Sequence, residues 1–486
     1  MIDLTINEKG LESAVQRARE RNIIIPTFAQ QKDPTLISSQ ITEELESIGL
    51  WDIHPRNLFR INWKNEPISE GGGFNNVNYI ELPPELTGVE ARIICLVGKY
   101  FPTGSHKVGA TFGCLVPRLV TGQFNPVIHK AVWPSTGNYC RGGAYNATLL
   151  ACESIAILPE EMSSERFKWL QSVAGEIIKT PGSESNVKEI FDKVWELKRT
   201  RENLFVFNQF EEFGNYLWHH QVSGHAIKEV LEKELGNNKF RGLTLTSGSA
   251  GTLGSGDYLK QIYPSMRIVA GEALQCPTML LTGYGAHKIE GIGDKHIPWI
   301  HNIKNTDMVI AIDDVDTVNI MRLFNEKEGQ KYLKEMGIAE EVIEKLPLLG
   351  ISSIANLLMS IKFAKYFELT KNDVIVTIYT DSMELYQSRL HELNQKNGSY
   401  TRDDAIRDFY AHLQGQKIDN MLELDYMEKK RIHNLKYFTW IEQQNRELEE
   451  LNNQWYDEDY WRIIPRLSKD IDELIVEFNE KTGLLK

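Results

Sequence analysis

The chain has 486 residues, of which 42% are hydrophobic and 25% are charged, values typical of a globular protein with a substantial core. Its formal net charge of −13 disfavours binding to nucleic acid or an anionic membrane, and no apolar run reaches the roughly 18 residues of a membrane-spanning helix. The five cysteines show neither CxxC spacing nor a disulfide-dense pattern, so we expect a cytoplasmic protein without a metal centre.

The predicted elements follow a regular order along the chain. Residues 1–85 form a polar leader with helical stretches, and residues 86–390 alternate apolar runs with helical patterns. Such alternation predicts an α/β fold with mainly parallel sheets, helices on both faces and ligand-binding loops at the carboxyl ends of the strands. Residues 391–486 are rich in Glu, Lys and Arg with interspersed aromatic residues, which predicts a helical extension that packs on the body or on a partner subunit. The runs with strand character include Ala91–Val97, Val127–Trp133, Ser154–Leu158, Leu204–Phe207, Gly242–Thr246, Arg267–Ala270 and Val374–Tyr379.

Lys107 lies in the segment Phe101–Ala110, directly after the first predicted strand. Ser105 is a favourable N-cap, so Lys107 is expected in the first turn of a helix. The positive end of the helix dipole favours the neutral amine there, and a neutral lysine can form an imine with an aldehyde. The alternative is a surface lysine that merely follows a turn.

Three further loops follow predicted strands. Residues 134–138, Pro-Ser-Thr-Gly-Asn, can cradle an anion such as a carboxylate at a helix start. Residues 247–252, Ser-Gly-Ser-Ala-Gly-Thr, are neither a Walker loop nor a dinucleotide fingerprint, and they suit a compact phosphate monoester. Residues 380–382, Thr-Asp-Ser, end the last strand. Each loop also has a purely structural interpretation. Residues 134–138 could be a common strand-to-helix turn, residues 247–252 a turn that serves packing, and residues 380–382 a helix cap.

Taken in chain order, these loops resemble the β-family, or fold type II, of pyridoxal-phosphate enzymes, the tryptophan synthase β-like superfamily. The resemblance runs through most of residues 91–390 and is closest to the cysteine synthase and cystathionine β-synthase branch. It implies two parallel or mixed sheet domains, the smaller and mobile one at about residues 110–215. It also implies pyridoxal 5'-phosphate as the cofactor, a small amino-acid substrate and a homodimer.

The matched motifs imply roles for individual residues. Lys107 looks like the lysine that forms the Schiff base, and Asn138 matches a position that reaches both the substrate carboxylate and the 3-oxygen of the cofactor. The other implied cofactor residues are Gly248, Ser249, Ala250, Gly251 and Thr252 in the phosphate cup and Ser382 at the pyridine nitrogen. The other implied substrate residues are Ser135, Thr136 and Gly137 in the carboxylate loop, Gln209, and Gly291 in the segment His287–Gly293.

The sequence also departs from the family's pattern. Asn138 is followed by Tyr139, Cys140 and Arg141 where cysteine synthases usually have small residues, so the pocket above the substrate side chain is expected to differ. The phosphate cup has Ser and Ala in place of Thr and Gly, and a segment around Glu326–Lys345 looks inserted. The leader and the extension have no counterpart in the minimal enzymes.

A phosphate cup and an imine-forming lysine suit an aldehyde cofactor that carries a phosphate. Once the substrate amine displaces Lys107, this lysine can take the Cα proton as a general base, with the pyridine ring as the electron sink. A neutral hydroxyl from Ser382 at the ring nitrogen would favour loss of a β-substituent to give an aminoacrylate, whereas the Asp381 carboxylate would favour a pyridinium and different chemistry. The family's register selects Ser382, and adjacent residues of an extended chain point to opposite faces.

Two outcomes of an aminoacrylate stay open. A thiol or sulfide can add to it, as in a cysteine synthase-like β-replacement, or it can be released in β-elimination, as in cysteine desulfhydrases, serine/threonine dehydratases or diaminopropionate ammonia-lyases. The two share every residue named above. A scaffold that had lost its cofactor would show damage in one of the loops, and none is damaged. A nucleotide-dependent oxidoreductase is disfavoured because the dinucleotide fingerprint is absent.

Overall fold

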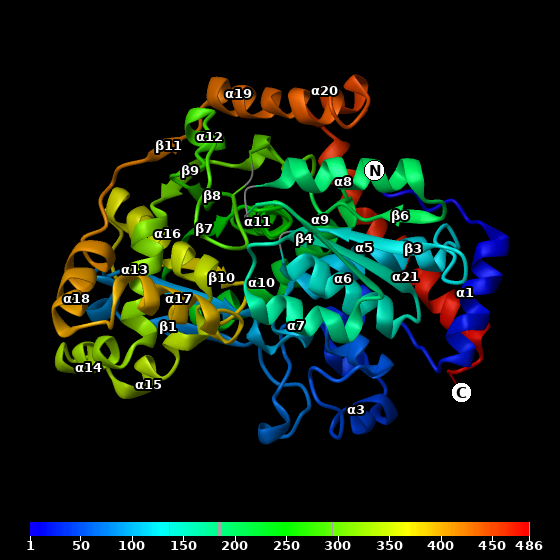
Figure 1. Cartoon of the computed structure of the whole chain (residues 1–486), viewed down its shortest axis with the longest axis horizontal. Helices are drawn as coiled ribbons and strands as arrows, with labels where there is room; N and C mark the ends of the chain where they lie inside the picture. Colours follow the sequence, from blue (N-terminus) through cyan, green and yellow to red (C-terminus); the bar gives the residue numbers. More distant parts are fainter. Residues whose placement is uncertain (136, 183–185, 294, 486) are drawn as a thin grey trace.

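The computed structural model describes residues 1–135, 137–182, 186–293 and 295–485. Two β-sheets form its centre, with helices around them (Figure 1). The strands are β1 (Tyr79–Leu82), β2 (Arg92–Val97), β3 (Lys130–Pro134), β4 (Glu153–Pro159), β5 (Glu176–Thr180), β6 (Leu204–Val206), β7 (Lys239–Thr246), β8 (Arg267–Ala273), β9 (Met308–Ile312), β10 (Asp373–Tyr379) and β11 (Met421–Glu423).

The helices occupy most of the sequence between these strands. They are α1 (Glu8–Glu20), α2 (Phe28–Lys32), α3 (Ser39–Leu45), α4 (Pro84–Thr87), α5 (Lys107–Val120), α6 (Asn138–Leu149), α7 (Ser164–Val173), α8 (Val187–Thr200), α9 (Phe213–Trp218), α10 (Gly224–Glu234), α11 (Leu253–Ile262), α12 (Thr278–Leu281), α13 (Asp314–Asn325), α14 (Lys327–Glu335), α15 (Glu340–Ile343), α16 (Ile351–Tyr366), α17 (Gln387–Asn397), α18 (Arg402–Arg407), α19 (Tyr426–Lys436), α20 (Leu448–Tyr456) and α21 (Tyr460–Thr482).

The larger sheet has the strand order β1-β2-β10-β7-β8-β9-β11, and the smaller sheet has the order β5-β4-β3-β6. All pairings are parallel except those of the two edge strands, β1 with β2 and β11 with β9. The predicted α/β class with parallel and mixed sheets is therefore confirmed. The two antiparallel edges come from the predicted leader and the predicted extension, so both segments contribute a strand to the larger sheet.

Both sheets are covered on their two faces. Successive residues of a strand point to opposite sides, so each strand contributes side chains to the packing on both faces. In the smaller sheet, Val132 and Ile155 pack with Ile190 and Val194 of α8, in one hydrophobic cluster. Their neighbours Ala131 and Ala156 belong to a different cluster, which includes residues of α5 and α6. The chain thus buries each strand as a continuous apolar run, as the strand-like segments of the sequence predict.

Helix α16 is a core helix of the larger sheet, with most of its side chains fully buried. Within the described ranges no single helix is long and apolar enough to cross a membrane; α16 meets that criterion only together with residues 340–348, across a bend of 120°. The segment predicted as an insertion forms α14 and α15, and α14 lies beside α13 and α18.

The two ends of the chain pack against each other. Helix α1 lies along α21 in Figure 1, and the two helices are in contact. The Asn479 side chain bonds both backbone groups of Ile25, at 2.8 and 3.0 Å. The predicted aromatic packing of the extension is present: Trp440 is fully buried and donates to the carbonyl of Ile297, and Trp461 is nearly buried.

Candidate active site

Loops at the carboxyl ends of β2, β3, β7 and β10 meet around a small cavity. This is the edge of parallel sheets at which ligands bind. A larger groove lies beside α21 but contains none of the predicted site residues. The smaller cavity is lined by Lys107, Ser135, Asn138, Tyr139, Gln209, Phe210, Gly248, Ser249, Gly291, Ile292 and Thr380.

Lys107 is the first residue of α5, and its Nζ donates a hydrogen bond to the Ser249 hydroxyl over 3.1 Å. The helix N-cap is His106 rather than the predicted Ser105, whose hydroxyl instead accepts from the amide of Lys107. Burial, reinforced by the charge of Lys107, holds the pKa of His106 well below its ordinary value. The predicted place of Lys107 in the first helical turn is confirmed, and the lysine meets the predicted phosphate loop directly.

The phosphate loop, residues 248–252, joins β7 to α11. Its turn requires a left-handed backbone at Ala250, with φ of 64°. Among the described residues, none of the five loop amides donates a hydrogen bond to another protein group. The first amide along the chain that does so is that of Leu253, which donates to the carbonyl of Ala250. A Cβ at Gly251 would come within 2.0 Å of Oδ1 of Asn215, whose Nδ2 donates to Ser249 and to the carbonyl of Gln209 at 3.0 Å each.

Asn215 is a residue that the sequence analysis does not identify. It is fully buried on α9, where its only sequence signal is an amide in an otherwise apolar helical turn. By bonding Ser249 and the carbonyl of Gln209, it ties the phosphate loop to the predicted substrate-binding glutamine.

The predicted carboxylate loop forms a second wall of the cavity. Ser135 accepts from the Gly137 amide over 3.2 Å and from Nε2 of Gln209 over 3.3 Å. The predicted substrate residues Ser135, Asn138, Gln209 and Gly291 all line the same cavity. Thr136 lies outside the described residues. Gly137 does not line the cavity, and a Cβ on it would meet Nη1 of Arg166 at 2.4 Å.

Asp381 is fully buried and turns away from the helix that follows it. Its Oδ2 accepts from Nδ2 of Asn138 over 2.6 Å and from the Tyr386 hydroxyl over 2.7 Å. The reading of Asp381 as a helix cap is therefore wrong: the next helical turn, Met383–Leu385, has Ser382 at its N-cap and no side-chain capping bond.

Ser382 is buried but is not among the residues that line the cavity, whereas Thr380 is. The Thr380 hydroxyl lies 3.3 Å from Nε2 of His106, the residue next to Lys107. The assignment of Ser382 to the pyridine nitrogen stays a prediction. Thr380 is a further hydroxyl at the same strand end, to which the sequence analysis assigns no role.

The two bulky residues after Asn138, Tyr139 and Arg141, lie in different places. Tyr139 lines the cavity, as expected of a residue that changes the pocket. Arg141 does not line it: its guanidinium is buried over the rings of Trp51 and Trp169, at 5.3 and 4.8 Å, without a hydrogen-bond partner in the described chain. Burial, and then the nearby charge of Arg166, lowers the pKa of Arg141 to about 10.

The residues present fit pyridoxal 5'-phosphate. The unbonded amides of residues 248–252 precede the first turn of α11, and such a helix N-terminus binds a phosphate. Lys107 reaches the same loop through Ser249, so a lysine amine lies where an aldehyde attached to that phosphate would be held. Gly248 allows the close approach of the Gly291 backbone, since a Cβ would lie 2.9 Å from the Gly291 carbonyl oxygen.

Comparison with known proteins agrees with this geometry. A probable cysteine synthase from Bacillus subtilis is 29% identical over 299 residues, which cover 61% of this chain and 89% of that protein. Cystathionine beta-synthase from Saccharomyces cerevisiae is 26% identical over 335 residues, 67% of this chain and 63% of that protein. A hydrogen sulfide-producing enzyme from Fusobacterium nucleatum matches in structure with a TM-score of 0.54 and 23% identity, over 71% of this chain and 95% of that one.

The family model described as "Pyridoxal-phosphate dependent enzyme" matches residues 79–331, which include Lys107, the carboxylate loop and the phosphate loop. That match covers more than half of the sequence, and the two-sheet fold and the cavity accord with it. The chain therefore belongs to the family of pyridoxal-phosphate dependent enzymes.

Proposed function

We propose that this enzyme catalyses a β-replacement on a small β-substituted amino acid, adding a thiol or sulfide in the manner of a cysteine synthase. The observation that carries the proposal is the meeting of Lys107 with the phosphate loop in a cavity that Ser135 and Gln209 also line. The similarity to cysteine synthases, at 29–31% identity, supports the same reaction class.

The roles of the residues follow from their chemistry. The amides of residues 248–252 would hold the cofactor phosphate, and Lys107 would hold its aldehyde. Bound pyridoxal 5'-phosphate supplies an electron sink for negative charge at Cα of the substrate. Ser135 and Gln209 bind and orient the substrate carboxylate, so that the Cα proton faces Lys107.

Once the substrate amine has displaced Lys107 from the aldehyde, the freed amine of Lys107 acts as the general base, because it is the basic group of the cavity that adjoins the phosphate loop. It takes the proton from Cα when the β-substituent leaves and returns one to Cα after the nucleophile has added. Tyr139, Phe210 and Ile292 line the cavity with apolar and aromatic surface, which excludes water from the reacting atoms.

The experiment is a product analysis. Cofactor-loaded protein is incubated with O-acetyl-L-serine, with and without sulfide, and the products are identified by mass spectrometry. Formation of cysteine that depends on both substrates, and its loss in Lys107→Ala, is the expected result. Absence of turnover with O-acetylserine, serine, cysteine and threonine in the folded, loaded protein refutes the proposal.

β-Elimination is the competing outcome of the same residues, and the same incubation separates the two. Pyruvate and ammonia formed at a rate independent of sulfide would identify elimination. We also propose that the enzyme is a homodimer acting on a small amino acid, on the strength of the family resemblance. Light scattering on the purified protein measures the mass and tests the dimer.

A further inference from the structure

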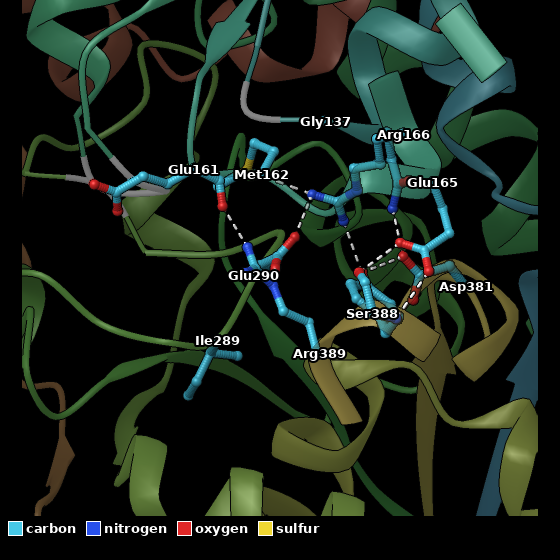
Figure 2. Close-up of polar contacts among 12 residues, drawn as sticks. Gly137, Glu161, Met162, Glu165, Arg166, Ile289, Glu290, Asp381, Ser388 and Arg389 are labelled. Atoms are coloured by element: carbon cyan, nitrogen blue, oxygen red, sulfur yellow. Dashed lines mark hydrogen bonds and ion pairs between the residues drawn. The ribbon is translucent and has the colours of Figure 1, made fainter. Parts of the chain in front are cut away.

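A buried polar chain links the smaller sheet to the wall of the cavity, and Figure 2 shows the part of it around Arg166, Glu290 and Asp381. Arg166 lies on α7, between β4 and β5, and its side chain is fully buried. Its Nη1 lies 2.9 Å from Oε2 of Glu290, and its Nη2 donates to the Tyr386 hydroxyl over 2.7 Å. Glu290 precedes the cavity residue Gly291, and Tyr386 follows the strand end of β10. Arg166 therefore joins elements of both sheets beside the cavity.

The chain continues to Asn138. The Tyr386 hydroxyl donates to Oδ2 of Asp381, and the same oxygen accepts from Nδ2 of Asn138 over 2.6 Å. Burial raises the pKa of Asp381, and the charge of Arg166 with the bonds from Tyr386 and Asn138 opposes that rise. Because Oδ2 of Asp381 accepts from Nδ2 of Asn138, Asp381 commits the Asn138 amide to one orientation.

Two glycines leave the space that this chain of contacts needs. A Cβ on Gly350 would lie 1.8 Å from Oδ1 of Asp381, and a Cβ on Gly137 would lie 2.4 Å from Nη1 of Arg166. Gly350 also donates its amide to the Asp381 carbonyl over 3.1 Å. The Asp381 side chain therefore lies against the backbone of Gly350, and the Arg166 side chain lies against the backbone of Gly137. Tyr386 bonds both side chains.

A neighbouring set of contacts docks α7 without touching Asp381. Glu165 accepts from the amide and the hydroxyl of Ser388 over 2.8 and 2.7 Å. Arg389 pairs with Oε1 of Glu290 at 2.5 Å and also donates to the carbonyl of Glu161. Figure 2 shows these residues around Arg166. Glu165 therefore offers a matched control at the same interface, because it docks the same helix but lies outside the path to Asn138.

We propose that Arg166 and Tyr386 are positioning residues, which hold Asp381 as the anchor of Asn138 and thereby set the affinity of the cavity for the amino-acid substrate. The proposal rests on the proposed function, in which an amino acid binds in the cavity that Asn138 lines. A role of Arg166 only in docking α7 would not set the affinity for the substrate, because Glu165 and Arg389 also dock this helix.

The test is a double-mutant cycle between Tyr386→Phe and Asn138→Ala. The dissociation constant of O-acetyl-L-serine is read from the absorbance change of the cofactor-loaded protein. Tyr386→Phe should weaken binding about tenfold, as expected for the loss of a buried hydrogen bond, and should have no further effect in the Asn138→Ala background. Glu165→Gln should change binding less than twofold in either background. Full additivity of Tyr386→Phe and Asn138→Ala, or equal effects of Tyr386→Phe and Glu165→Gln, overturns the proposal.

A second readout needs neither substrate nor cofactor. In the apoprotein, hydrogen exchange of the first turn of α6 should be faster in Tyr386→Phe and in Arg166→Met than in the parent, and unchanged in Glu165→Gln. If the parent responds to no amino acid, the proposed function has failed while the exchange result still decides the positioning role. Unchanged exchange in a folded Tyr386→Phe protein refutes that role, even if Arg166→Met does not fold.

Discussion

Replacement of Gly251 by alanine tests the phosphate loop at its tightest point. The added Cβ would lie 2.0 Å from Oδ1 and 2.6 Å from Cγ of Asn215, so the asparagine has to turn away. It then loses its bonds to the Ser249 hydroxyl and to the Gln209 carbonyl, both 3.0 Å long. At about 1 kcal/mol for each bond, the binding-competent form of the loop is destabilised by about 2 kcal/mol, which corresponds to roughly 30-fold weaker binding of the cofactor.

The assay is a titration of the apoprotein with pyridoxal 5'-phosphate, followed by absorbance. Gly73→Ala is the control, because a Cβ there would lie 3.7 Å from the nearest atom, a side-chain oxygen of Glu66. In the double variant Gly251→Ala/Asn215→Ala, the clash is gone, so its affinity should match that of Asn215→Ala alone. An unchanged affinity in folded Gly251→Ala would show that the loop is only a packing turn.

Three further predictions follow from the site and its surroundings. Gln209→Ala should weaken binding of the amino acid by about 1.5–3 kcal/mol, the value of a hydrogen bond to a charged group, and binding of the decarboxylated amine much less, as parallel absorbance titrations would show. Ser382→Ala should keep much of the activity, whereas Ser382→Asp should slow loss of the β-substituent in a stopped-flow assay; similar rates for both variants would count against the ring-nitrogen assignment. Burial raises the pKa of Glu272 to about 7 from its ordinary 4.5, so the protonated form is favoured in the folded state. Its stabilising contribution is then present below about pH 4.5 and is lost, by about 3 kcal/mol, as the pH rises to about 7. Urea unfolding should show Glu272→Gln gaining stability over the parent between about pH 5 and about pH 8, and parallel pH profiles would disprove the assignment.

Much of the fold is predictable from local pattern, because strands buried on both faces appear as continuous apolar runs. The runs at Arg267–Ala270 and Val374–Tyr379 lie within β8 and β10. The predicted strand Val127–Trp133 begins only at Lys130, since residues 126–128 form a turn. The sequence analysis names no run at β1, β5, β9 or β11. The three residues of β11 become a strand only by pairing with β9.

The site is predictable to a similar degree. Motifs that follow strands locate Lys107 and the phosphate loop, because parallel strands bring their carboxyl ends to one edge. Arg166 could not be found this way: in sequence it is one charged residue of an amphipathic helix. It meets Tyr386, 220 positions away, only when the chain has folded. The role of Asp381 could not be predicted from local sequence either, because its partner Asn138 lies 243 positions away. Asp381 bonds this residue and does not cap the following helix.

The central claim is that Lys107 carries the cofactor. The most direct measurement is reduction of the cofactor-loaded protein with borohydride, followed by proteolysis and mass spectrometry of the modified peptides. The account predicts that the pyridoxyl group is found on the peptide that contains Lys107, and that Lys107→Ala protein yields no labelled peptide. Labelling of a different lysine in the parent, or no labelling of a folded and cofactor-saturated protein, would contradict it.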